Sequence, residues 1–193
     1  VESDGGKLRT GFLGTRPLLA VLADHGHADL AYEVVSDPEF PGWVYMLREG
    51  ATTVWERWDS DSDEHIGGRM NSLNHSPFAC VSEWFYEHLA GIDVRLGGDG
   101  PDVVVAPSIP DGLPWAEGSV ETPLGTVESR WAADDGGYDL SVTIPWNADG
   151  RIAVPVDDGS AVSVDGETVW EGNGAAHEGV RRTDGVVEVE VRS

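Results

Sequence analysis

Two short stretches of the chain carry most of the residue types that could do chemistry. The first runs from Trp43 to Asp59 and contains three tryptophans, a tyrosine and several acids. The second, residues 70–75, reads Met-Asn-Ser-Leu-Asn-His. Indole faces stack on the apolar CH faces of a pyranose, while carboxylates, amides and imidazoles bind its hydroxyls. The combination predicts a sugar-binding site.

Glu56 is the sharpest candidate in this set, because it lies between Trp55 and Trp58. Indole walls remove water from a carboxylate, which suits the group to proton transfer. In an alternative interpretation the two tryptophans are core residues and Glu56 forms a structural ion pair with Arg57 or Arg48. The spacing alone leaves both interpretations open.

His75 also has two interpretations, since it stands directly before Ser76-Pro77. It could cap the helix that follows, or it could contact a ligand. Position alone favours the cap.

An acidic run at residues 59–64 resembles a calcium loop only superficially. The calcium pattern needs Gly at its sixth position and Glu at its twelfth. Counted from Asp59, these positions hold Glu64 and Met70. We therefore expect a solvated acidic loop and no metal site.

Other catalytic motifs are poorly matched. Zinc needs three or four ligands in suitable geometry, and the chain has no Gly-x-Ser-x-Gly motif for a nucleophilic serine. The glycine pairs are typical of turns rather than phosphate loops. The histidines that we interpret as surface or capping residues are His25, His27, His65 and His88.

Helices are predicted to carry the chemical stretches. Apolar residues recur at helical spacing over 15–37, with a break at 25–27, so the sequence predicts a helix pair. Thr15 should cap the first helix, with Pro17 in its first turn. A shorter helix is expected over 40–48, and another over 76–91.

The pattern changes to strands from Asp93 onward. Short alternating runs are separated by Gly, Pro and Asp, which is typical of an antiparallel β-sandwich. We expect a helical part at residues 1–92, thin in core by itself, and a β-sandwich domain at 93–193. The runs lie at 103–105, 118–130 (with a turn at 123–125), 138–144, 151–156, 161–164 and 186–191.

The charge balance narrows the class of partner. The 193 residues include 35 acids against 12 Lys and Arg, a net charge of −23, and Lys7 is the one lysine. Nucleic acids and anionic membranes need basic surface, so neither is an expected partner. Salt screens the repulsion between acids, so this balance predicts a cytoplasmic protein of a high-salt organism, with an ordinary acidic soluble protein as the alternative.

Neither disulfides nor membrane insertion are expected. The chain has one cysteine, Cys80, which we expect to be a buried, inert thiol. No segment approaches the roughly 20 apolar residues of a membrane helix, and no signal peptide is evident. The start at Val1, without Met, suggests the middle of a longer chain.

Several of these strings, in this order, resemble the second half of the catalytic barrel of the α-L-rhamnosidases of glycoside hydrolase family 78. They are Gly11–Thr15, Trp43–Met46, Gly50–Trp58 and Met70–His75, of which Gly-Ala-Thr-Thr-Val-Trp-Glu-Arg-Trp at 50–58 is the most specific. Residues 123–129 with Trp131 resemble, more weakly, the C-terminal β-sandwich of that family.

The resemblance implies an α+β multidomain protein, a partial (α/α)6 six-hairpin barrel followed by an antiparallel β-sandwich. It implies an inverting glycosidase that needs no cofactor, with Glu56 as general base and His75 as a sugar ligand. Trp43 and Trp58 fall where aromatics line the family's pocket, and Trp55 and Asn74 are further substrate-binding candidates. The family's general acid lies in the earlier barrel half and has no counterpart in this sequence.

Three functions therefore remain as hypotheses. The chain is part of a rhamnoside hydrolase that is inactive by itself, a non-catalytic carbohydrate-binding module, or a structural part that complements a separate polypeptide. The expected partners are a rhamnose-containing oligosaccharide or glycoside and the N-terminal half of the barrel. Because helices meant to close a barrel expose an apolar face, we also expect self-association.

Overall fold

The computed structural model describes residues 5, 7–61, 64, 67–134, 136–172, 174–175, 178–183 and 185–192. The chain divides into two compact units, Val1–Trp84 and Phe85–Ser193. Some residues named above lie outside the described ones. They are residues 1–4, Ser62 and Asp63 of the acidic run, and His65.

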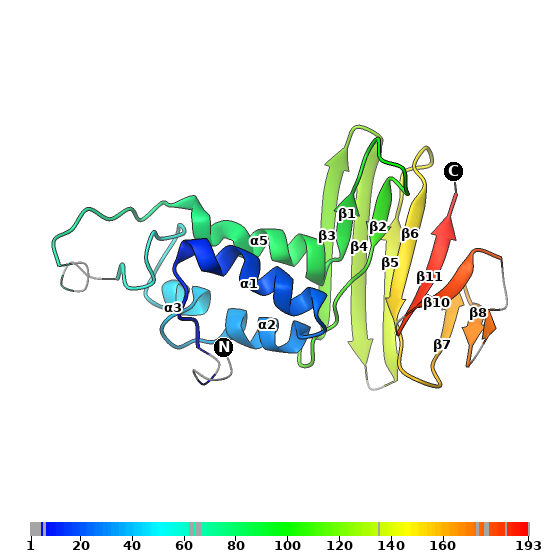
Figure 1. Ribbon diagram of the computed structural model, residues 1–193, viewed down its shortest axis with the longest axis horizontal. Helices are drawn as coiled ribbons and strands as arrows, with labels where there is room; N and C mark the ends of the chain where they lie inside the picture. Colours follow the sequence, from blue (N-terminus) through cyan, green and yellow to red (C-terminus); the bar gives the residue numbers. More distant parts are fainter. Residues whose placement is uncertain are drawn as a thin grey trace. The chain divides into compact units, whose positions relative to one another are not determined.

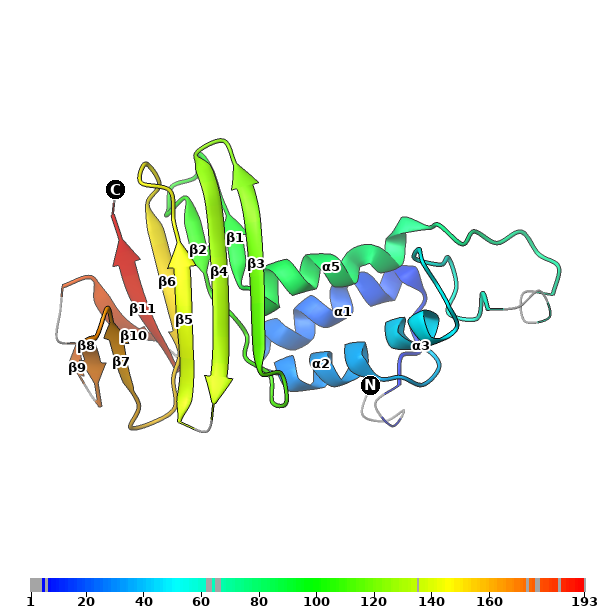
Figure 2. The same cartoon turned by 180° about the vertical axis from the view of Figure 1, so that it is seen from behind.

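The first unit is built on a helical hairpin, which confirms the predicted pair. Helix α1 (Phe12–Asp24) and helix α2 (Ala28–Ser36) flank the break at 25–27 and lie side by side (Figures 1 and 2). Leu19 of α1 is buried, as are Ala31, Val34 and Val35 of α2. The 3.6-residue period thus places one apolar stripe of each helix in the core.

The predicted start of α1 was wrong. The helix begins at Phe12, after Gly11, so Thr15 lies inside it and is fully buried. The Thr15 hydroxyl donates to the Gly11 carbonyl at 3.0 Å, the back-bond that threonine makes within a helix. Pro17 consequently lies in the second turn, not the first.

The remaining helices of the first unit are short. Helix α3 (Trp43–Arg48) begins later than expected, after a cis Phe40–Pro41 bond and Gly42. A residue before proline is biased away from helix, which explains why Phe40 does not start it. The predicted helix after His75 begins as the 3-10 turn η2 (Ser76–Ala79) and continues as α5 (Cys80–Trp84). Phe78, Val81 and Trp84 are its buried residues.

The second unit opens with a π-helical turn, η3 (Phe85–Leu89), and continues as strands. The chain divides before η3 because this turn packs on strands β1 and β3. The predicted domain boundary at residue 92 stays a prediction. The strands are β1 (Ile92–Val94), β2 (Val103–Val105), β3 (Trp115–Thr122), β4 (Gly125–Asp134), β5 (Gly137–Thr143), β6 (Gly150–Pro155), β7 (Ala161–Val164), β8 (Glu167–Glu171), β9 (Gly174–Ala175), β10 (Val180–Thr183) and β11 (Val186–Val191).

These strands form three sheets, and the β prediction is confirmed. A five-stranded sheet has the order β1-β2-β6-β11-β10, and two three-stranded sheets are β3-β4-β5 and β7-β8-β9. One pair, β2 with β6, is parallel, where the sequence predicted antiparallel strands throughout. The β3-β4-β5 sheet lies between them in sequence and supplies the long crossover that a parallel pair requires.

The core of the second unit lies between the first two sheets. Ile92, Val103 and Val105 of the five-stranded sheet pack with Val127 of β4. Trp131 of β4 is fully buried, and its indole Nε1–H donates to the Leu89 carbonyl at 2.7 Å. No helix in the described part of the chain is long and apolar enough to cross a membrane.

Candidate functional site

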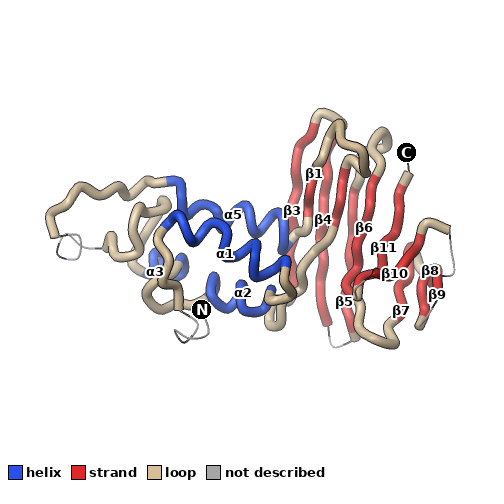
Figure 3. The backbone as a smooth tube through the Cα atoms, viewed as in Figure 1, coloured by secondary structure: helices blue, strands red, loops and turns tan. Residues whose placement is uncertain are grey.

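The backbone brings the two chemical stretches together. The Glu56 amide donates to the Ser72 carbonyl at 2.9 Å, and the His75 amide donates to the Val54 carbonyl at 2.7 Å. The Thr53 hydroxyl also donates to the Leu73 carbonyl. Segments 53–56 and 72–75 are loops rather than regular elements (Figure 3). These bonds hold them side by side, so Glu56 and His75 belong to one site.

Glu56 is held by one of its two carboxylate oxygens. Its Oε2 accepts a hydrogen bond from the Ser72 amide at 2.8 Å. Its Oε1 has no hydrogen-bond partner among the described residues, and the side chain is half-buried. One oxygen therefore fixes the carboxylate and the other remains for a water or a hydroxyl.

The two arginines of the ion-pair alternative make their salt bridges with carboxylates other than Glu56. Arg57 donates two hydrogen bonds of 2.8 Å to Asp59, and these bonds raise the pKa of the Arg57 guanidinium. Arg48 lies 3.7 Å from a carboxylate oxygen of Glu39. This arrangement favours a chemical over a structural use of Glu56.

Glu56 lines two hollows of the first unit. The larger, about 840 Å³, is formed by Thr53, Glu56 and residues 70–75. The smaller, about 520 Å³, is formed by residues 8–12, Phe40, Pro41, residues 56–59 and Phe78. Glu56 thus lies between a hollow formed by the 70–75 loop and a hollow with aromatic residues in its wall.

Trp58 supplies that aromatic wall. Its ring stacks on Phe78 at a centroid distance of 3.8 Å and meets Trp43 edge-on at 5.1 Å. Its Nε1–H donates to the Thr10 carbonyl at 3.0 Å. The indole is therefore fixed in orientation while it lines the smaller hollow.

Trp43 and Trp55 lie behind this wall. Trp43 is 8% exposed and its Nε1–H donates to the Phe78 carbonyl at 2.8 Å. Trp55 is 5% exposed and packs with Met46 and Phe78. Neither lines the two hollows, so in this structure they support the site from the core.

His75 and Asn74 lie on the larger hollow. His75 precedes η2 but makes no side-chain capping bond, and its ring meets Phe12 edge-on at 6.2 Å. Asn74 is exposed. Its backbone N–H donates to the Ser72 hydroxyl at 3.2 Å, which fixes its position in the loop. Both side chains can therefore contact a ligand beside Glu56.

The residues that sequence reasoning missed are those that build the loop. Ser72 holds Glu56 through its amide, and Asn71 accepts a hydrogen bond from the Ser60 hydroxyl at 3.0 Å. Backbone donors leave no signal in a sequence. Among the described residues, no group of three or more His, Cys, Asp or Glu could hold a metal ion.

Two family models match the chain. The bacterial alpha-L-rhamnosidase 6 hairpin glycosidase domain matches residues 1–89, and the bacterial alpha-L-rhamnosidase C-terminal domain matches residues 101–168.

Curated relatives agree with these matches. The chain is 40% identical over 157 residues to an alpha-L-rhamnosidase of Alteromonas sp. (strain LOR), covering 80% of this chain and 17% of that protein. It is 38% identical over 161 residues to one of Streptomyces avermitilis, covering 81% and 15%.

Solved structures agree as well. An alpha-L-rhamnosidase from Dictyoglumus thermophilum has a TM-score of 0.83 at 29% identity, covering 96% of this chain and 20% of that one. The Streptomyces avermitilis enzyme complexed with L-rhamnose has a TM-score of 0.72 at 31% identity, covering 99% and 19%. The chain therefore spans about a fifth or less of the length of these relatives.

A helical hairpin followed by mainly antiparallel sheets, with a carboxylate beside an aromatic-walled hollow, defines a part of a six-hairpin glycosidase. The chain belongs to the α-L-rhamnosidase family, and includes parts of its six-hairpin domain and its C-terminal domain.

Proposed function

We propose that this chain is part of a glycoside hydrolase that removes terminal α-L-rhamnose with inversion, and that Glu56 is its general base. The observation that carries the proposal is the Glu56 carboxylate, which is fixed through Oε2 while Oε1 has no partner among the described residues. The relatives, which are alpha-L-rhamnosidases, supply the substrate class.

The proposed chemistry is single displacement at the anomeric carbon. Glu56 takes a proton from a water, which attacks that carbon on the face opposite the leaving group. A second carboxyl protonates the departing oxygen, and the two groups of an inverting pair stand roughly 6.5–9.5 Å apart. Both carboxylate oxygens of Asp59 accept hydrogen bonds from Arg57. In line with the family resemblance, we assign the general acid to an earlier part of the barrel.

His75, Asn74 and Trp58 have binding roles in this proposal. His75 and Asn74 bind sugar hydroxyls in the larger hollow, and Trp58 presents its indole to an apolar face of the ring. Trp43 and Trp55 hold Trp58 and Phe78 in place.

Apolar side chains on the first unit support a partner that completes the barrel. Leu13 is 84% exposed, Leu47 66% and Met70 98%. Exposed apolar side chains that form a contiguous patch mark surfaces that another polypeptide covers. We propose that further hairpins cover them, and that without such hairpins the chain self-associates.

The test is a chimera in which this chain replaces the matching C-terminal segment of the Streptomyces avermitilis enzyme. We expect it to hydrolyse an aryl α-L-rhamnoside, and Glu56→Gln to lower kcat by at least about 1,000-fold without changing the melting temperature. Glu49→Gln, on an exposed carboxylate at the end of α3, is the matched control.

Two results would contradict the proposal. One is a folded chimera whose Glu56→Gln variant keeps its rate. The other is robust hydrolysis by the isolated 193-residue chain, because it would place the general acid within this chain.

A further inference from the structure

The Ser60 hydroxyl connects the two segments that build the Glu56 site. It lies 3.0 Å from the Arg57 carbonyl oxygen and 3.0 Å from Asn71 Oδ1, and it donates to both acceptors. A hydroxyl has one hydrogen, so Ser60 shares it between the two in a three-centre bond. Arg57 follows Glu56 in the chain, and Asn71 precedes Ser72. Ser60 thus ties the residue after the carboxylate to the residue before the amide that holds it.

The Ser72 amide is held from both sides by these contacts. On its C-terminal side, backbone hydrogen bonds to segment 53–56 hold the loop. On its N-terminal side, the Ser60 hydroxyl holds Asn71. The Ser72 N–H belongs to the planar peptide group that joins it to Asn71, so a rotation of that plane would turn the N–H away from Glu56 Oε2, which now lies 2.8 Å from the nitrogen.

Ser60 itself is buried away from the space that a sugar could fill. It is 8% exposed and lines neither of the two hollows beside Glu56. The two hydrogen bonds of 2.8 Å between Arg57 and Asp59 fix the start of the turn that contains it, at residues 58–61. A buried hydroxyl costs free energy unless it is hydrogen-bonded. The Ser60 hydroxyl is therefore an anchor for the loop and not a ligand of the substrate.

We infer that Ser60 is a positioning residue for the general base. By holding Asn71, it keeps the Ser72 amide on Glu56 Oε2, and Oε1 then stays directed at the attacking water. This inference rests on the proposed role of Glu56 and adds a residue that acts on catalysis without touching the substrate. Loss of the hydroxyl should lower kcat and leave KM nearly unchanged, because the groups that bind the sugar stay in place.

The first test is the steady-state kinetics of Ser60→Ala in the chimera defined above. A misplacement of about 1 Å can cost about 100-fold in rate, so we expect kcat to fall by about 10- to 100-fold, with KM within about twofold. Asn71→Ala removes the same hydrogen bond from its other end and should lower kcat by a similar factor, which provides the test if Ser60→Ala does not fold. For Asn71→Ala only kcat is compared, because Asn71 lines the larger hollow.

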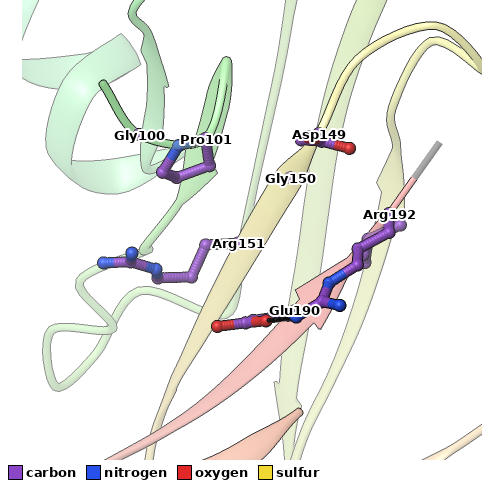
Figure 4. Close-up of a pocket in the computed structure, with 8 residues that line it drawn as sticks. Gly100, Pro101, Asp149, Gly150, Arg151, Glu190 and Arg192 are labelled. Atoms are coloured by element: carbon purple, nitrogen blue, oxygen red, sulfur yellow. Dashed lines mark hydrogen bonds and ion pairs between the residues drawn. The ribbon is translucent and has the colours of Figure 1, made fainter. Parts of the chain in front are cut away.

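Two substitutions that remove comparable hydrogen bonds elsewhere are matched controls. Ser36→Ala removes a serine hydroxyl that donates to the Tyr32 carbonyl at 2.7 Å within α2. Arg192→Gln removes a bond of 2.9 Å to Glu190 beside a hollow of about 170 Å³, where β6 begins and β11 ends (Figure 4). Both variants should keep the kcat of the chimera.

A double-mutant cycle separates positioning from a general effect on the fold. If Ser60 acts through Glu56, adding Ser60→Ala to Glu56→Gln should cause no further loss of kcat. An equal further loss in the double variant would overturn the inference, and so would a folded Ser60→Ala variant with unchanged kcat. Both of these results leave the proposed base in place. A Glu56→Gln variant that keeps its rate would instead contradict the proposed function and the inference together.

Exchange of the Ser72 amide hydrogen in the 193-residue chain reports the same geometry without turnover. The hydrogen bond to Glu56 protects this amide, and Ser60→Ala should speed its exchange by about fivefold or more, as expected for the loss of one supporting hydrogen bond. The amide of Val127 in β4 is the internal reference and should keep its rate. Unchanged exchange of the Ser72 amide in Ser60→Ala would overturn the inference.

Discussion

Trp58 offers a graded test of how the aromatic wall beside Glu56 is built. Replacing Trp58 by Phe keeps a ring against Phe78 but removes the hydrogen bond to the Thr10 carbonyl, which is 3.0 Å long. Replacing it by Ala removes the hydrogen bond, the stacked contact at 3.8 Å and the edge contact with Trp43 at 5.1 Å.

The two substitutions should differ clearly in free energy of unfolding. The lost hydrogen bond is worth about 0.5–1.5 kcal/mol. Each aromatic contact adds about 0.5–1.5 kcal/mol beyond area burial, and truncation of a large buried side chain costs about 3–5 kcal/mol in total. Because Trp58 is half-buried, we expect about 1 kcal/mol for Trp58→Phe and about 3 kcal/mol for Trp58→Ala.

Urea unfolding followed by circular dichroism at 222 nm measures this difference, since that signal reports the helices of the first unit. Trp115→Ala, on an exposed strand position of the second unit, is the matched control and should leave the transition in place. If Trp58→Ala costs no more than Trp58→Phe, the stacked wall does not exist as described.

Three further predictions concern the second unit and the charge. Trp131→Phe should lower the free energy of unfolding by about 2–4 kcal/mol, because it leaves the buried Leu89 carbonyl unpaired and creates a cavity; a loss below about 1 kcal/mol in denaturant titration would count against the bond. Burial raises the pKa of the Tyr138 hydroxyl, so near pH 10 only the unfolded chain loses this proton. The free energy of unfolding should therefore fall as the pH rises above about 10, and it should fall less steeply in Tyr138→Phe. The chain has a net charge of −23, so its melting temperature should rise between about 0.1 and 1 M KCl, because the Debye length shrinks from about 10 to 3 Å. An unchanged or lower melting temperature would refute the prediction of a high-salt cytoplasm.

Helices and strands could be predicted wherever the spacing of apolar residues matches the pattern of buried side chains. The helix pair at α1 and α2 follows from apolar residues at helical spacing, and β4 follows from the alternation that buries Val127, Ser129 and Trp131. The start of α1 failed because a threonine hydroxyl can bond either forward, as a cap, or back to a carbonyl four residues earlier. A local pattern contains no information on which of these bonds forms.

The site was only partly predictable for a related reason. Glu56, His75 and Asn74 were identifiable by residue type, and the family resemblance gave them roles. Their proximity depends on backbone hydrogen bonds between segments 53–56 and 72–75, which are far apart in sequence and have no regular period. The burial of Trp55 is likewise a matter of packing against Met46 and Phe78 that spacing does not encode.

The role of Glu56 as general base is tested most directly by chemical rescue in the chimera. Glu56→Ala removes the group that activates water, but an azide ion needs no activation and can enter the space that the side chain leaves. With an aryl α-L-rhamnoside, azide should restore turnover and form β-L-rhamnosyl azide, since attack comes from the face opposite the leaving group. Restored turnover with an α-configured azide, or no rescue in a folded variant, would contradict the assignment of Glu56.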